Sequence, residues 1–465
     1  MSIFSRFLTP YYRAQLSYPL GKLCRDLNNV LSAIFILHRT QEVFMSSKLV
    51  NNELESESID QSSKMPRDRS QWLKKLKAVA LVAPLFLFTL SVFVVPVIML
   101  LVRSVDNPEL QSTWPKTVNA LQQWEAKALP DAKTFSLLVI EIKQSRVDKT
   151  LFKVSKRLNY ELSGMRSLIN RTGRKLARIE LATPEVLKKQ LLKIDPRWGE
   201  IHTWQAIKRA SPVITSHYLL AATDLRLNDA GEVVAASEYQ AIYIDILLRT
   251  LWIAFVVTIL CLILGFPLAH LMANAPSRWT GWLMIGLLLP FWTSLLVRTS
   301  AWMVLLQKNG VLNSILLDIG VISEPLALLY ERSATFIAMT HLLLPFMVLS
   351  LYSVMKSISP VYMRAALSLG AHPVVAFIKV YIPQTLPGVA AGGLLCFILA
   401  LGYYITPALV GGADDQMLSY FIAYYTNQAI NWGMASALGV VLLLISGLLF
   451  VVYIRLSNSN SLDKR

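Results

Sequence analysis

The chain has 465 residues, of which 54% are hydrophobic and only 16% are charged, and its formal net charge is +16. Soluble domains carry about 25% charged residues, and the apolar residues here come in long uncharged runs, which indicates membrane-spanning helices rather than a large soluble core. The positive charge is therefore interpreted by position, because lysine and arginine orient membrane helices, and we predict no nucleic-acid partner.

The N-terminal segment, residues 1–77, contains no run long enough to cross a membrane. Residues 46–70 are polar and rich in serine and glutamate, so we expect the segment to be partly disordered. It also lacks the charged start, apolar core and cleavage site of a signal peptide. One hypothesis is that translation begins at Met45 or Met65.

The first predicted span, residues 78–102, is uncharged and long enough to cross a hydrocarbon core of about 30 Å. Five further apolar runs bring the predicted number of transmembrane helices to six; they cover residues 247–272, 281–306, 334–356, 387–410 and 433–454. Prolines inside these runs are compatible with membrane helices whose neighbours bind the freed carbonyls. The sequence therefore predicts an all-α integral membrane protein.

Residues 104–243 form a long insertion between the first and second predicted spans, with more Lys and Arg than Asp and Glu. Apolar residues recur at three- and four-residue spacing over 116–194, which predicts helices. Thr183 is the expected N-cap of one helix, with Pro184 as its first residue. We predict a mostly helical external region that either docks a partner or acts as a passive spacer.

The short loops predict the orientation of the spans. Basic residues occur before the first span, in the loops 273–280 and 357–386, and in the tail 456–465, whereas the loop 411–432 has two aspartates and no Lys or Arg. Basic loops stay in the cytoplasm. This places both termini in the cytoplasm and the insertion outside, which is the periplasm in a double-membraned bacterium.

The loop 357–386 is too long for a simple turn, and its residues predict a shaped docking element. Ala365 and Ala366 leave a helix surface without bulk. Gly370 is expected to end that helix in the left-handed conformation. A second helix should begin near Pro373, and Pro383 and Pro387 should stop it and start the next span.

This segment, "RAALSLGAHPVVAFIKVYIPQTLPGV", resembles the EAA loop of ABC-importer permeases. The residues in register with that pattern are Ala365, Ala366, Gly370, Pro383, Pro387 and Gly388. Residues 247–273, 287–316 and 341–360 resemble the polyamine-type branch of these permeases, so the likeness covers most of 245–455. It implies a MetI-like transmembrane fold in which 361–387 forms the coupling helix that lies in a groove of the ATPase subunit.

The same resemblance implies the partners and the location of the chain. The expected partners are an ATP-binding cassette ATPase dimer, a second similar permease and a periplasmic solute-binding protein, with membrane lipid around the spans. The expected location is the bacterial inner membrane. Arg364 stands where the family has glutamate, so either the ATPase differs to match or the pairing is dispensable. A surface ion pair contributes only about 0–1 kcal/mol, so the small residues and the bend at Gly370 should matter more.

The chain is not expected to be an enzyme, because it contains no phosphate-binding G-x-x-x-x-G-K-[ST] motif, no H-E-x-x-H and no G-x-S-x-G. ATP hydrolysis must then come from another chain. Cys24, Cys261 and Cys396 lie far apart, and the last two are interpreted as small core residues. Neither a disulfide framework nor a metal or cofactor site is predicted.

Several polar and aromatic residues within the spans are candidates for the substrate path. They are Arg298, Thr299, Trp302, His341, Tyr403 and Tyr404. A charge inside a span suggests function unless it reaches the interface or binds a neighbouring helix, and both interpretations of Arg298 remain open. His341 could equally be a hydrogen-bonded buried histidine, Trp302 a packing residue, and the tyrosines an aromatic belt.

The predicted function is translocation of a small solute: a polyamine, an opine or an amino-acid-like compound. The span interiors contain no Asp or Glu, so a polyamine would have to contact aromatic faces. Arg298 instead suits an anion, so a permease of the same family for an anionic organic solute is the alternative. A membrane receptor and a lipid-modifying enzyme are remote alternatives, because neither a cytoplasmic output domain nor clustered catalytic residues are evident.

Overall fold

The structure is a computed structural model that describes residues 79–180, 182–228, 231–238 and 240–462. The predictions for residues 1–77, including a start at Met45 or Met65, lie outside the described residues. The chain divides into two compact units, residues 1–87 and 88–465, and each is considered by itself. Of the first unit only 79–87 is described, and it is helical. All that follows concerns the second unit.

The described residues contain five helices that are long and apolar enough to cross a membrane. They are Val79–Arg103, Tyr243–Asn274, Arg332–Ser357, Pro373–Gly402 and Trp432–Arg455. A sixth candidate is a pair of segments, Ser277–Trp292 and Leu295–Asp318, which are bent by 100° relative to each other. The first of these helices includes a π-helical turn, η2 (Leu90–Val94), followed by α3 (Val95–Arg103).

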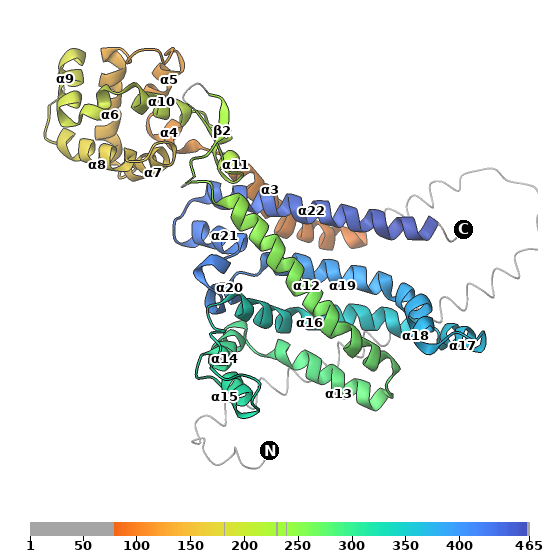
Figure 1. The fold of residues 1–465 in the computed structure, drawn as a ribbon. Helices are drawn as coiled ribbons and strands as arrows, with labels where there is room; N and C mark the ends of the chain where they lie inside the picture. Colours follow the sequence, from red (N-terminus) through yellow and green to blue (C-terminus); the bar gives the residue numbers. More distant parts are fainter. Residues whose placement is uncertain (1–78, 181, 229–230, 239, 463–465) are drawn as a thin grey trace, which may run out of the picture. The chain divides into compact units, whose positions relative to one another are not determined.

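The centre of the bundle is formed by α12 (Tyr243–Asn274), α16 (Arg332–Ser357) and α19 (Ile382–Gly402) (Figure 1). Cys261 and Cys396 are fully buried in the apolar cluster between these helices, which confirms their interpretation as core residues. A side chain at Gly392 would place its Cβ only 2.9 Å from Met347 Sδ. Small residues permit such close approach, and close approach stabilises helix pairs in lipid.

The expected continuous span over 281–306 is wrong, because the chain bends there. It forms α13 (Ser277–Leu288), the 3₁₀ turn η4 (Leu289–Trp292), α14 (Leu295–Leu306) and α15 (Val311–Asp318). Pro290 has no N–H and cannot continue the hydrogen-bond ladder. The Arg298 side chain donates hydrogen bonds to the carbonyl of Pro290 and to the carbonyl of Thr293 at 3.1 Å. The arginine thus adds to the hydrogen bonds that the Thr293 N–H and Oγ1 make to the Pro290 carbonyl, and it ties α14 to the bend.

The first and last residues predicted for the fifth span, 387 and 410, are also both wrong. Pro383 and Pro387 do not stop a helix, because α18 (Pro373–Ala376), the π turn η5 (Phe377–Tyr381) and α19 form one run from Pro373 to Gly402. The wider π turn precedes Pro383 and leaves room for its ring, which would otherwise meet the preceding turn. After Gly402 the chain breaks, and α20 (Ile405–Val410) follows as a separate short helix.

The helical pattern predicted within 104–243 is confirmed. The helices are α4 (Pro108–Thr113), α5 (Pro115–Gln122), α6 (Ala132–Val147), α7 (Leu151–Glu161), α8 (Met165–Leu176), α9 (Pro184–Ile194), η3 (Pro196–Gly199), α10 (Ile201–Arg209) and α11 (His217–Ala221). Thr183 is the N-cap of α9, as expected. The antiparallel pair β1 (Leu225–Leu227) and β2 (Val233–Ala235), with Leu225 opposite Ala235, was not expected.

The α4–α10 region has a core of its own, built around buried tryptophans. Trp114, Trp198 and Trp204 are fully buried. Trp198 Nε1 donates to Thr172 Oγ1 at 2.9 Å, and Trp204 Nε1 donates to the Trp198 carbonyl at 2.9 Å. The polar edge of each indole is therefore satisfied inside an apolar cluster.

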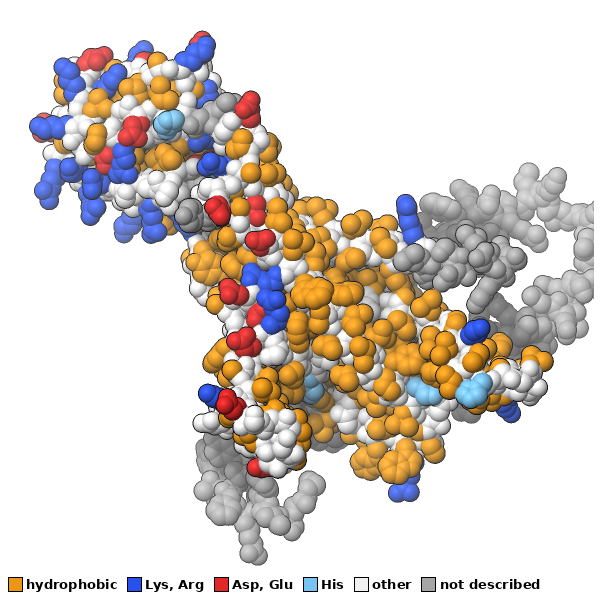
Figure 2. Space-filling model, in the orientation of Figure 1, with side chains coloured by type: hydrophobic (Ala, Val, Ile, Leu, Met, Phe, Trp, Pro, Cys, Tyr) orange, Lys and Arg blue, Asp and Glu red, His pale blue; other side chains and the backbone are white. Residues whose placement is uncertain are grey.

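The remaining segments lie between α20 and the end of the described chain. They are η6 (Ala413–Asp415), α21 (Leu418–Asn427) and α22 (Trp432–Leu462). Arg332 Nε lies 2.6 Å from Asp415 Oδ1, and Arg249 donates to the Asp414 carbonyl, so two arginines hold this turn. Figure 2 shows apolar side chains spread over the long helices, and Lys and Arg side chains gathered over the α4–α10 region.

Gly392→Leu should weaken the packing of α19 on α16, because the added side chain would meet Met347 and Ser350. We expect a loss of about 1–3 kcal/mol, typical of overpacking, seen as a lower thermal unfolding midpoint in detergent. Gly447→Leu is the control, since no atom lies within 4 Å of a Cβ at that position of α22. Equal midpoints for both variants would contradict the packing account.

Arg298→Gln should destabilise the bend, because it removes the hydrogen bonds of the guanidinium to the Pro290 and Thr293 carbonyls, and a typical hydrogen bond contributes about 0.5–1.5 kcal/mol. Arg298→Lys should restore part of the stability by keeping a donor. The control is Arg278→Gln, which removes an exposed arginine whose side chain makes no hydrogen bond or ion pair with any residue that the structure describes. A normal unfolding midpoint for Arg298→Gln, together with a raised KM for uptake, would assign Arg298 to the substrate path instead.

Candidate functional site

The first candidate site is α17 (Pro360–Ser368), which lies at one end of the bundle beside α18 (Figure 1). None of its residues is buried. The helix ends at Leu369, whose side chain is 89% exposed, and Gly370 follows with φ +87°. The prediction of a left-handed glycine at this bend is therefore confirmed. A short helix without a buried face, next to a sharp turn, is suited to contact with another chain.

The residues predicted to couple to an ATPase fall into two groups. Arg364, Ala365 and Gly370 are exposed on α17 and its turn, with Ala366 half-buried beside them. Pro383, Pro387 and Gly388 belong to α19 instead, and Gly388 is buried, with Val354 Cβ 3.0 Å from the position its own Cβ would take. Gly388 thus serves helix packing in this chain.

The charge around α17 is entirely positive. Residues 356–402 contain no Asp or Glu, while Lys356, Arg364 and Lys379 lie in this stretch. All three are exposed. A surface of this sign attracts a partner that presents carboxylates, and it does so most strongly at low ionic strength.

The second candidate set is the residues predicted to line a substrate path, and the structure brings only some of them together. Trp302 Nε1 donates to His341 Nδ1 at 3.2 Å, with the rings 5.4 Å apart and nearly perpendicular. His341 also lines an apolar cavity of about 340 Å³ with Pro290 and Pro345. Arg298 is occupied by the carbonyls of the bend, which favours its interpretation as a bridge between helices.

The other path candidates lie apart from this cavity. Thr299 is buried, and its Oγ1 lies 3.4 Å from Thr406 Oγ1, so it joins α14 to α20. The Tyr403 carbonyl accepts a hydrogen bond from Ser419 Oγ at 2.8 Å. Tyr404 lines a separate hollow of about 310 Å³ with Tyr420 and Tyr424. The six predicted residues therefore do not share one cavity within this chain.

A third site, which the sequence did not predict, lies where α4, α7 and α11 meet the ends of the long helices. Asp224 caps α12, because its carboxylate accepts the backbone N–H groups of Tyr243 and Ile244 at 2.9 and 2.8 Å. Such a cap suits the positive end of a helix dipole. The residues are nearly twenty positions apart, so no local pattern predicts the pairing.

A buried polar cluster lies next to this cap. Arg157, whose side chain is 1% exposed, donates to Asn107 Oδ1 at 2.6 Å and to Glu161 Oε1 at 2.8 Å. His217 Nδ1 lies 3.2 Å from Glu161, and Arg209 lies 3.8 Å from it. Burial lowers the pKa of His217 to about 4, so the imidazole is neutral at pH 7. Two guanidinium groups thus face one carboxylate, which leaves an excess positive charge.

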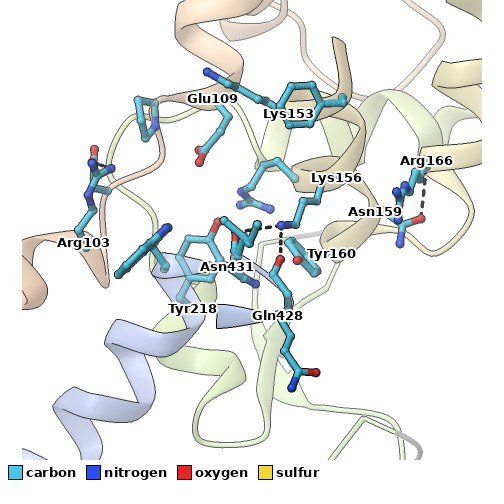
Figure 3. Close-up of a pocket in the computed structure, with 18 of the residues that line it drawn as sticks. Arg103, Glu109, Lys153, Lys156, Asn159, Tyr160, Arg166, Tyr218, Gln428 and Asn431 are labelled. Atoms are coloured by element: carbon cyan, nitrogen blue, oxygen red, sulfur yellow. Dashed lines mark hydrogen bonds and ion pairs between the residues drawn. The ribbon is translucent and has the colours of Figure 1, made fainter. Parts of the chain in front are cut away.

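A cavity of about 890 Å³ adjoins this cluster (Figure 3). Lys156 from α7 donates to the carbonyls of Ala429 and Ile430, in the turn between α21 and α22. Burial lowers the pKa of Lys156 below its usual range. On another side of the cavity, Gly433 lets Tyr218 approach so closely that a Cβ at Gly433 would lie 2.4 Å from the tyrosine ring. The turn 428–433 is therefore fastened to α7 and α11.

Comparison with known proteins gives a consistent result. The spermidine/putrescine transport system permease protein PotB of Escherichia coli (strain K12) is 35% identical over 216 residues, which cover 46% of this chain and 78% of PotB. PotB of Haemophilus influenzae is 34% identical over 217 residues, covering 47% of this chain and 76% of that protein. The inner membrane ABC transporter permease YdcU of E. coli is 34% identical over 236 residues, covering 47% and 73%. No family model matches the chain.

Among solved structures, a bacterial alginate ABC transporter is 18% identical with a TM-score of 0.37, over 46% of this chain and 78% of the matched chain. That likeness is too distant to add to the assignment, which rests on the sequence relatives. The matches span about three quarters of these permeases and less than half of this chain. On this evidence the chain belongs to the family of ABC transporter permeases that includes the spermidine/putrescine permeases.

Proposed function

We propose that the chain is the membrane-spanning permease subunit of an ABC importer, with the bent pair Ser277–Trp292 and Leu295–Asp318 as the third of six spans. The observation that carries the proposal is α17. It is a helix with no buried residue, it ends in a left-handed glycine, and it occurs in a chain 35% identical to known permeases.

In this proposal α17 is the coupling helix that transmits closure of separate ATPase subunits to the spans. Val361, Tyr362 and Leu369 present large apolar side chains that are 57%, 56% and 89% exposed. Arg364 reverses the sign of the family's glutamate, and the acid-free stretch around it means that the matching ATPase groove would offer carboxylates. Ala365 and Ala366 would let the groove wall approach the helix closely.

The proposed topology has both termini in the cytoplasm of a bacterial inner-membrane protein, with α4–α11 in the periplasm. The basic loops 273–280 and 357–386 support this orientation. The expected partners are an ATPase dimer, a second permease, which would complete the path, and a periplasmic binding protein, which would deliver the solute. The firm attachment of α4–α11 to α12 through Asp224 supports a docking role for this region rather than a loose spacer.

The proposed solute is a polyamine or a similar small amino compound. The names of the PotB relatives support this class. The alternative, an anionic solute, depended on a free guanidinium at Arg298, and that group is engaged with the carbonyls of Pro290 and Thr293. The proposed aromatic contacts for a cationic solute are Trp302 beside His341 and, at a separate point of the path, Tyr404 in its own hollow.

Gly370→Val should uncouple ATP hydrolysis from uptake, because a β-branched residue at φ +87° resists the left-handed conformation by about 1–2 kcal/mol and would reshape the turn. Ala365→Trp should do the same by blocking the helix surface. We expect at least a tenfold loss of uptake at unchanged expression and thermal stability.

Gly320→Val is the matched control for this experiment. Gly320 also has a positive φ, +70°, and open space around its Cβ, but it follows α15. If Gly320→Val lowered uptake as much as Gly370→Val, or if neither did, the coupling role of α17 would be wrong.

Uptake of radiolabelled spermidine and putrescine tests the solute class. The chain, co-expressed with the subunits that co-purify with it, should restore saturable polyamine uptake to a host that lacks it. Trp302→Ala should raise KM by about five- to tenfold, since a cation–π contact contributes up to about 2 kcal/mol when desolvated. Uptake of organic anions without polyamines would support the alternative solute class.

A further inference from the structure

The cavity in Figure 3 lies where two membrane-spanning helices end. Its lining includes Arg103, the last residue of one span, and Trp432, the first residue of another. These two spans pack against each other, with Leu100 3.3 Å from the Cβ position of Gly439. A cavity bounded by the ends of two packed spans lies at the depth of the lipid headgroups, whichever way the chain is oriented.

The charges that line the cavity are not balanced within the protein. Arg103 is paired with Asp106 at 3.1 Å. Lys153, Lys156 and Arg166 also line the cavity, and among the described residues none of them has a carboxylate within 4 Å. Lys156 uses two of its three N–H donors on the carbonyls of Ala429 and Ile430, which leaves a third donor for a ligand. The excess charge of the adjacent Arg157 cluster adds to the positive potential.

One carboxylate in the cavity also lacks a partner. Glu109 Oε2 is inaccessible to solvent and accepts no hydrogen bond from the described part of the chain, although the charge of the carboxylate acts on Lys156. An unpaired buried carboxylate oxygen is costly, and a ligand cation would satisfy it. The cavity lining therefore includes three cations and one carboxylate, and Figure 3 shows Lys153, Lys156 and Arg166 on different sides of it.

The rim of the cavity is apolar. Phe152 and Ile430 are each 62% exposed, and Trp432 is 55% exposed. Ile430 also has φ +49°, which is unusual for a β-branched residue, and its carbonyl is bound by Lys156. Large apolar side chains beside a charged hollow suit an amphipathic ligand.

We propose that this cavity binds a phospholipid whose headgroup carries both a phosphate and a primary amine, of the phosphoethanolamine class. Lys153, Lys156 and Arg166 bind the phosphate oxygens, and Glu109 accepts hydrogen bonds from the ammonium group. The apolar rim contacts the start of the acyl chains. The bound lipid would join α7 to the turn 428–433 and so stabilise the attachment of the α4–α11 region to α22. This proposal depends only on the spans and not on the transported solute.

Native mass spectrometry of the full chain from nanodiscs tests the proposal. The nanodiscs contain equal parts of phosphatidylethanolamine, phosphatidylglycerol and phosphatidylcholine, and we expect the first of these to be retained preferentially. The variant Lys153→Gln/Arg166→Gln should reduce retained lipid at least fivefold. Neither side chain makes a hydrogen bond or ion pair with the described residues, so the variant should fold. Lys189→Gln/Lys193→Gln, exposed on α9, is the matched control.

Glu109→Gln separates recognition of the amine from recognition of the phosphate. It should shift retention from phosphatidylethanolamine towards phosphatidylglycerol without reducing total lipid. Thermal unfolding distinguishes a bound lipid from a free headgroup. If the ligand is a lipid, phosphatidylethanolamine should raise the unfolding midpoint, and inorganic phosphate and glycerophosphoethanolamine should not. Equal lipid retention in all variants would overturn the proposal. It would also be overturned if Lys153→Gln/Arg166→Gln retained lipid normally and lost only the binding of a solute-binding protein.

Discussion

Inside a membrane, each backbone carbonyl and N–H group must find its partner within the protein, and this requirement governs where the spans of this chain bend. Pro290 breaks the helix in the third apolar run. There the guanidinium of Arg298 donates hydrogen bonds to the carbonyls of Pro290 and Thr293. Near Pro383 the same requirement is met by a π turn, so that helix continues. The helix therefore ends just before Pro290 but continues through Pro383, because a π turn precedes only the second of these prolines.

The continuous helix through Pro383 bears on the proposed coupling role of α17. Because the run from Pro373 to Gly402 is one helix, a movement of α17 and the turn at Gly370 would reach α19 without a break in the helix. α19 is packed on α16 through Gly388 and Gly392, where the side chains of Val354 and Met347 lie in the space that a Cβ would take. A rigid path from an exposed helix to the centre of the bundle is what transmission of ATPase movement to the spans would need.

The sequence predicted the parts of the molecule that depend on local patterns. The helices of 116–194, Thr183 as an N-cap and the left-handed Gly370 follow from periodicity and single-residue preferences, and each matches the structure. The apolar runs predicted where long helices occur, but not the bend within 281–306 or the limits of the run predicted at 387–410. The sequence could not predict that Arg298 binds the carbonyls of the bend, because the bend itself was not predicted. It could not predict that Asp224 caps α12, because that pairing joins residues nearly twenty positions apart. The lipid cavity was missed for the same reason, because Lys153 and Arg166 look like solvated charges and Glu109 lies on another helix.

The most direct test of this account is site-specific photocrosslinking in native membranes. A photoreactive residue at Leu369, whose side chain is 89% exposed beside Gly370, should crosslink to a protein that carries a phosphate-binding G-x-x-x-x-G-K-[ST] motif. The same residue at Ile319, which is 64% exposed after α15, should give no such product. Crosslinking to an ATPase from position 369 alone is the predicted result, and no product there, or the same product from both positions, would contradict the coupling role of α17.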